Sequence, residues 1–294
     1  MKKLFTIFLS AFLGLFSLEA GVPVKTNLIS TEDISVLSLN VGKLYKDATE
    51  NKWEDRVQGI IGMMLEEEPL VAGFQTMLAS QREELSTVLV KYSAIGAGAL
   101  NGADKGPQNV VFYRNDLLEL ENSGTFWFSN TPSKPKTKFD CAEQICCATW
   151  AVFRLGGSGR RFIILNTSLD SKSEDARKLQ AEMILEKLDE YGKGLPAVVM
   201  GDFNAGQAGT FGKDMKNPSV VLNSRLIDSR RMSFCSSSEK SQHYYGKKKA
   251  QMSDYIFYSP EFEGILFKTL TKPYEDVRFL SDHYPIRNYI RFRK

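Results

Sequence analysis

Residues 196–206 read PAVVMGDFNAG, and this stretch joins a buried strand to two polar side chains. The five residues from Pro196 to Met200 are apolar, and Asp202 and Asn204 follow within four positions. A continuous apolar run of this length, closed by a glycine, is typical of a strand buried on both faces. Polar groups at the end of such a strand must find partners. The stretch therefore predicts that Asp202 and Asn204 have a specific task.

Other predicted strands also carry polar residues at their ends. Short apolar, aromatic or β-branched runs bounded by Gly, Pro or Asn predict strands at 34–40, 69–75, 109–116, 124–129, 147–154, 161–169, 253–259 and 283–292. The polar residues at strand ends are Asn40, Gln75, Asn166, Asp202, Asn204, Asp254, Asp282 and His283. This recurrence predicts one shared cleft at one edge of the sheets.

Two amphipathic helices are predicted between these strands. One face of the first is formed by Trp53, Val57, Ile60, Ile61 and Met64. The second follows Ser173 as its N-cap, ends at Gly192, and buries Ala181, Ile184, Leu185 and Leu188. The order strand, helix, strand over 34–75 predicts a crossover and a parallel pair. Many strands with a few helices predict two packed sheets with helices outside them.

The bulk composition is that of an ordinary globular protein. Of 294 residues, 43% are hydrophobic and 25% charged, and we expect one domain over 21–294, present as a monomer. The net charge of +3 becomes +2 without Lys2, Lys3 and Glu19, because two cations and one anion are removed. This balance does not favour nucleic acid as a partner, since nucleic-acid binding usually shows a clear basic footprint.

The N-terminus has the layout of a secretory signal peptide over residues 1–20. Two lysines precede an apolar run from Leu4 to Phe16 and a short segment ending in Ala20. The run is too short for a comfortable membrane span, and no other stretch could span a bilayer. We therefore expect an exported protein, periplasmic or secreted, that begins near Gly21.

The chain has four cysteines, Cys141, Cys146, Cys147 and Cys235. Their spacing does not match a zinc site, and the chain has only two histidines, His243 and His283. Export permits disulfides, so we expect at least one, joining Cys235 to one of the other three. Free buried thiols are the alternative.

Several motifs occur along the chain in a distinctive order: SLN at 38–40, GFQ at 73–75, NVVFYR at 109–114, SGTFWFSNTP at 123–132, ATW at 148–150, NTSLD at 166–170, GDFNA at 201–205, DYIFYSP at 254–260 and SDHYPI at 281–286. In this order they resemble the endonuclease/exonuclease/phosphatase superfamily, over nearly the whole expected mature chain. The resemblance implies an α/β fold, a four-layer α/β/β/α sandwich. It also implies a phosphate-ester substrate, a Mg²⁺ cofactor with Mn²⁺ as the alternative, and in-line attack by an activated water.

The same resemblance implies a role for each polar strand end. His283 is the base or electrostatic partner of the attacking water, and Asp254 holds its tautomer. Asp202 orients the water, and Asn204 holds a phosphate oxygen. Asn40 and Asp282 lie at or near the metal, which prefers oxygen ligands. His243 lies near a position where the family often has a histidine, and a packing or solvent role is expected for it.

The departures from the family pattern are concentrated in this site. Thr76 stands where the family has its metal-binding glutamate, and Ser168 where it has a phosphate-contacting histidine. Cys146 and Met252 stand where arginines are common, and the acid expected near 106–108 is missing. Losing a direct ligand should weaken Mg²⁺ binding at least as much as the roughly 10–100-fold cost of an outer-shell change.

Two main functions remain open from the sequence. The chain is a divergent metal-dependent phosphoesterase with weak activity, or a catalytically silent pseudoenzyme that serves as a binding module. A third, nucleic-acid binding, is disfavoured by the charge. Asp47, Glu50 and Glu68 are the sequence neighbours that would compensate for the missing metal ligand.

Overall fold

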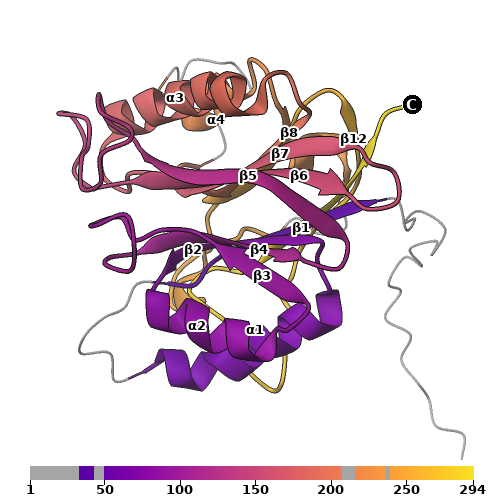
Figure 1. The fold of residues 1–294 in the computed structure, drawn as a ribbon. Coiled ribbons are helices and arrows are strands. Elements are labelled where there is room, and N and C mark those ends of the chain that lie inside the picture. Colours follow the sequence, from indigo (N-terminus) through magenta and orange to yellow (C-terminus); the bar gives the residue numbers. More distant parts are fainter. Residues whose placement is uncertain (1–32, 43–49, 207–215, 236–238) are drawn as a thin grey trace, which may run out of the picture.

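The computed structural model describes residues 33–42, 50–206, 216–235 and 239–294. Two β-sheets lie face to face, with α1 and α2 covering the outer side of one sheet and α3 and α4 the outer side of the other (Figure 1). The predicted α/β/β/α sandwich is confirmed.

The first sheet has seven strands in the order β10-β12-β13-β1-β2-β4-β3. Their bounds are β10 (Phe234–Cys235), β12 (Phe262–Thr269), β13 (Ile286–Phe292), β1 (Ile34–Asn40), β2 (Val71–Met77), β4 (Gln108–Arg114) and β3 (Tyr92–Ile95). The second has six strands in the order β5-β6-β7-β8-β11-β9. Their bounds are β5 (Leu118–Trp127), β6 (Cys147–Leu155), β7 (Arg161–Ser168), β8 (Ala197–Asp202), β11 (Asp254–Tyr258) and β9 (Ile227–Asp228). The helices are α1 (Trp53–Glu67), α2 (Ala79–Val88), α3 (Glu174–Gly192), α4 (Pro218–Leu222), α5 (Ser229–Met232) and the 3₁₀ turn η1 (Tyr244–Gly246).

The two long helices form where the sequence predicts them. The expected face of α1 is buried against the first sheet, and α1 connects the parallel strands β1 and β2. Ser173 caps α3 by accepting a hydrogen bond from the backbone N–H of Ala176, and α3 connects the parallel strands β7 and β8. Both are strand–helix–strand crossovers, so within each sheet the carboxyl ends of the two strands lie at one edge. The hydrogen bond from Asn40 to Asp202 brings these two edges together.

Several elements were not predicted from the sequence. Helix α2 buries only Gln81 and Leu85, so its apolar periodicity is too weak to identify it. Strand β12 is interrupted by a bulge between Gly264 and Leu266, and the edge strand β5 has no regular alternation of buried and exposed residues. A bulge or an exposed edge removes the alternation that reveals a strand.

The expected disulfide is not present in the structure. Cys141, Cys146 and Cys147 are free thiols, the first exposed and the other two buried. Burial raises the pKa of the Cys147 thiol to about 12 and that of Cys146 still further above its ordinary value. The prediction of a bridge from Cys235 to these residues is wrong, and the two buried cysteines serve as small apolar side chains.

None of the described helices is long and apolar enough to cross a membrane. The predicted signal peptide lies outside the described residues.

Gly201 marks a very close approach between β8 and β7. Its φ is +151°, and a Cβ atom at this position would lie 1.9 Å from the backbone oxygen of Thr167. Because the obstructing atom is backbone, Gly201→Ala must displace one of the two strands. We expect a loss of about 3 kcal/mol or more in the free energy of unfolding, measured by urea denaturation. The nearby Gly206, where a Cβ would meet nothing within 4 Å, is the control, and Gly206→Ala should change stability by less than about 0.5 kcal/mol. Equal stability of the two variants would contradict the close approach.

Candidate active site

Strand register brings the polar strand ends together at one edge of the sandwich. Asn40 pairs with Gln75 between β1 and β2, and Asp202 pairs with both Ser168 and Asp254 in the second sheet. A buried amide pair ties the two sheets together beneath this edge. Gln75 Nε2 donates to Asn166 Oδ1 at 2.7 Å, and Asn166 Nδ2 donates to the backbone oxygen of Val110 at 2.8 Å. The edge where the polar strand ends meet is therefore supported from below by hydrogen-bonded, buried amide side chains.

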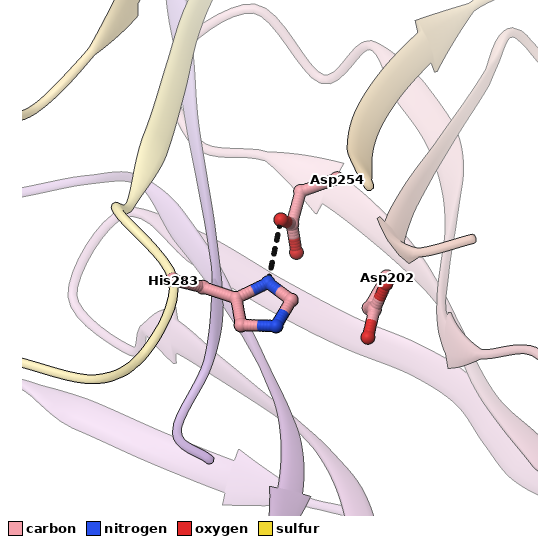
Figure 2. A group of neighbouring side chains, drawn as sticks. All are labelled: Asp202, Asp254 and His283. Atoms are coloured by element: carbon pink, nitrogen blue, oxygen red, sulfur yellow. Dashed lines mark hydrogen bonds and ion pairs between the residues drawn. The ribbon is translucent and has the colours of Figure 1, made fainter. Parts of the chain in front are cut away.

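The centre of the site is formed by Asp202, Asp254 and His283, all buried (Figure 2). His283 Nδ1 lies 2.7 Å from Asp254 Oδ2, and the Asp202 carboxylate faces the same imidazole ring. Ligand-type atoms of the three side chains all lie within 4.8 Å of one another. Asp254 thus fixes the orientation of the ring and leaves Nε2 as the nitrogen available to other groups.

The two carboxylates strongly perturb the titration of the ring. Burial by itself would lower the pKa of His283, but the charge and hydrogen bond of Asp254, with Asp202 and Asp282 nearby, raise it to about 10. Burial and the neighbouring Asp254 charge raise the pKa of Asp202 above its ordinary value, against the opposing effect of His283. At neutral pH His283 is therefore an imidazolium between two carboxylates.

Asp202 is held by three donors. Its Oδ2 accepts from Asn40 Nδ2 at 2.8 Å, and its Oδ1 accepts from the backbone N–H of Asn204 at 3.0 Å and from the hydroxyl of Ser253. Asn204 itself has a φ of +50°, and its Nδ2 donates to the backbone oxygen of Leu169 at 2.9 Å. Asp202 is therefore fixed in position, and the amide of Asn204 lies beside it with one N–H already used.

Thr76, where the resemblance implies a metal-binding glutamate, is tied to Asn40. Its Oγ1 donates to Asn40 Oδ1 at 2.6 Å, and the backbone N–H of Gly42 donates to the same oxygen at 3.0 Å. Two donors use both lone pairs of that oxygen. Thr76 has a φ of +59° beside a β-bulge, a rare conformation for a β-branched residue. The uncommon backbone conformation directs the Thr76 side chain toward Asn40. This side chain is a neutral hydroxyl that donates a hydrogen bond and carries no negative charge.

The donor set at Asn40 and Thr76 therefore does not fit Mg²⁺, which requires free oxygen acceptors and usually a carboxylate. Among the described residues, the group with metal-binding donors is Asp202, Asp254 and His283. Within it, Asp254 Oδ1 is buried without a hydrogen-bond partner. This oxygen is the acceptor of the cluster that a cation or another donor would satisfy.

Asp282 lies at the rim rather than in the centre. Its backbone oxygen accepts from the N–H groups of His243 and Tyr244, and its half-buried side chain accepts from Ser281 Oγ at 3.1 Å. Its Oδ1 lies 3.1 Å from where a Cβ on Gly42 would be, so Asp282 faces the end of β1. The site therefore brings together all six residues predicted from the sequence, with Asp282 at its edge.

Of the three acids proposed to compensate for the missing glutamate, the structure excludes one. Glu68 lies with Lys91 and Arg114 at the opposite end of β2 from Thr76. Glu50 is exposed and its Oε2 lies 2.8 Å from Lys247 Nζ. Asp47 lies outside the described residues.

The sequence assigned no role to Arg56, which acts from beneath the site. Arg56 is buried and donates to the backbone oxygens of Val41 and Leu280, which fixes the chain after β1 against the chain before His283. His243 is buried and stacked on Tyr284 with ring centroids 3.8 Å apart, in agreement with the expected packing role. The position of Arg56 just after Trp53 was the available signal, since a charge on the inner face of an amphipathic helix needs partners.

Fold and site together define a DNase-I-like α/β protein with an Asp–His pair and a second aspartate at the edge of its two sheets. The chain belongs to the endonuclease/exonuclease/phosphatase family, whose sequence model matches residues 37–283. Members of this family are phosphoesterases and typically depend on a divalent metal. No curated protein sequence matches the chain at a significant level.

Solved structures support the same membership. A family protein from Bacteroides thetaiotaomicron is 27% identical with a TM-score of 0.81, covering 89% of this chain and 98% of its own. A family protein from Bacteroides vulgatus is 25% identical with a TM-score of 0.81, covering 89% and 99%. A mannosyl-6-phosphatase from Bacteroides thetaiotaomicron is 28% identical with a TM-score of 0.80, covering 88% and 100%.

Proposed function

We propose that this protein is an exported phosphoric ester hydrolase in which Asp202, Asp254 and His283 activate a water molecule. The observation that carries the proposal is the intact cluster of these three buried side chains in a member of a phosphoesterase family. Weak affinity for Mg²⁺ or Mn²⁺ is part of the proposal, because Thr76 saturates Asn40 Oδ1. The partner is a phosphate ester, acted on by a monomer.

The protonation of the cluster suggests how the roles are divided. His283 is charged at neutral pH, so its Nε2–H donates to a phosphoryl oxygen and offsets the charge that develops there. Asp202, held by its three donors, accepts a proton from the attacking water. The water oxygen forms a bond to phosphorus, the P–O ester bond breaks, and the departing alkoxide takes a proton from solvent.

The pH dependence of kcat/KM tests this division of roles, with methyl 4-nitrophenyl phosphate and 4-nitrophenyl phosphate as probes. We expect kcat/KM to rise as Asp202 loses its proton, above the ordinary range of an aspartate near 4, and to fall as His283 loses its proton near pH 10. Asp202→Asn should remove the acid limb together with most of the activity. If His283 is the base, kcat/KM will instead increase as pH rises through 10, which would contradict the assignment.

The class of substrate remains a proposal. The similarity to a mannosyl-6-phosphatase favours a small phosphate ester, and the low net charge disfavours nucleic acid. Structural neighbours with less than 25% identity support the fold alone.

Export is proposed from the sequence of residues 1–20. We expect protein recovered from outside the cytoplasm to begin near Gly21, as determined by N-terminal sequencing. Recovery of that protein with residues 1–20 intact would contradict cleavage.

A second candidate function is a pseudoenzyme that binds a phosphate ester without hydrolysing it. The observation that favours it is the hydrogen bond from Thr76 to Asn40, which satisfies the site internally. Hydrolysis by the wild type that is lost in His283→Ala would eliminate this candidate.

A further inference from the structure

Three positions that depart from the family pattern line a single cavity. Thr76, Cys146 and Ser168 come from distant parts of the chain, yet all border a hollow of about 90 Å³. This hollow adjoins the site, because Thr76 contacts Asn40 and Ser168 is the strand partner of Asp202. The three replaced positions therefore determine the chemistry of one cavity.

The cavity is chemically neutral. The described residues that line it are Thr76, Ala99, Pro107, Asn109, Gln144, Ile145, Cys146, Cys147, Ser168 and Leu169. Their side chains carry no formal charge, because the two thiols keep their protons at neutral pH. A wall of hydroxyls, amides, thiols and methyl groups accepts an uncharged group and offers no counter-charge to an anionic oxygen.

The opposite side of the site is rich in carboxyl groups. Asp202 and Asp254 lie within 4.8 Å of His283, and Asp282 lies at the rim. A phosphomonoester dianion brings two negative charges to this surface, and a phosphodiester brings one. With a neutral wall at the cavity, the diester experiences less repulsion and also supplies an uncharged ester arm.

We propose that this cavity is a subsite for a small uncharged ester arm, so that the protein selects phosphodiester monoanions over phosphomonoester dianions. The proposal rests on the proposed function, since it places the phosphorus beside Asp202 and His283. A volume of 90 Å³ equals about three waters. It accommodates an arm of a few heavy atoms and excludes a nucleoside. Hydrolysis would then release an alcohol and leave a phosphomonoester.

Two probes without an activated leaving group separate binding from catalysis. O-methyl methylphosphonate is a monoanion with an uncharged ester arm, and methylphosphonate is a dianion without an ester arm. Calorimetry on the full chain at pH 8 should show at least tenfold tighter binding of the O-methyl probe. Equal binding, or tighter binding of methylphosphonate, would overturn the proposal.

A matched pair of substitutions tests the cavity itself. Ser168→Met fills it with neutral volume, and Ser168→Arg fills it with a similar length of side chain that carries a charge. Ser168→Met should abolish the preference for the O-methyl probe, and Ser168→Arg should reverse it in favour of methylphosphonate. Ala99→Val fills the cavity from another wall and replaces Ser168→Met if that variant does not fold. An unchanged preference in a folded cavity-filling variant would overturn the proposal.

Catalysis is measured separately with methyl 4-nitrophenyl phosphate and 4-nitrophenyl phosphate. Selective binding of the O-methyl probe without turnover of either ester would support the subsite and refute the proposed hydrolase. Turnover of both esters, with a monoester preference that Ser168→Met leaves unchanged, would support the hydrolase and refute the subsite.

Discussion

The double variant Thr76→Glu with Ser168→His is expected to bind Mg²⁺ at least about 10–100-fold more tightly than the wild type. Thr76→Glu removes the hydroxyl that donates to Asn40 Oδ1 and supplies a carboxylate beside that oxygen. Ser168→His adds a donor to phosphate next to Asp202. We therefore expect Mg²⁺-dependent hydrolysis of 4-nitrophenyl phosphate well above the wild-type rate, measured as released 4-nitrophenol.

The control for this gain is Thr76→Gln with Ser168→His, which matches the size of glutamate without its charge. It should gain little Mg²⁺ affinity and little activity. Adding His283→Ala to the active double variant should abolish the gain. Tight Mg²⁺ binding without hydrolysis of any phosphate ester would show that the cluster of Asp202, Asp254 and His283 does not activate water.

His283→Ala in the wild type is expected to reduce kcat by about 10²–10⁴-fold, the range for losing one acid–base group. The reason is that the buried imidazole lies within 4.8 Å of both carboxylates, and this group contains no second histidine among the described residues. Asp254→Asn should reduce kcat less, by about 10–100-fold, because it misorients the ring without removing it. Steady-state kinetics with methyl 4-nitrophenyl phosphate provide the measurement.

Asp228→Asn is the matched control for these losses. Asp228 is buried in the same sheet and caps α5 by accepting from the backbone N–H of Arg230, a role that asparagine can also fill. Its kcat should stay within about twofold of the wild type, as for a substitution away from special features. If Asp228→Asn lowers kcat as much as His283→Ala does, both losses reflect general destabilisation of the fold and not a catalytic role of His283.

The sequence predicted the sandwich and the residues of its site because both depend on strong local patterns. Strand β8 is a continuous apolar run, and α1 has a regular apolar face, so their types and burial follow from periodicity. Polar residues directly after such strands, as at Asp202 and Asn40, must meet at one edge once the strands are parallel. The family resemblance then supplied their expected roles.

Other features depended on tertiary contacts that no local pattern encodes. The hydrogen bond from Thr76 to Asn40 requires a positive φ at a bulge, which the sequence Gly-Phe-Gln-Thr does not reveal. The convergence of Cys146 with Thr76 and Ser168 on one cavity also depends on how the sheets face each other. The disulfide expectation failed because clustering in sequence says little about distance between side chains.

The central claim is that Thr76 closes the family metal position while the Asp202–Asp254–His283 cluster remains intact. The most direct test is a calorimetric Mg²⁺ titration of the wild type and Thr76→Glu, each with and without O-methyl methylphosphonate. The account predicts a wild-type dissociation constant of about 1 mM or weaker and a value at least about 10–100-fold lower for Thr76→Glu. Micromolar Mg²⁺ binding by the wild type that Thr76→Glu does not improve would contradict it.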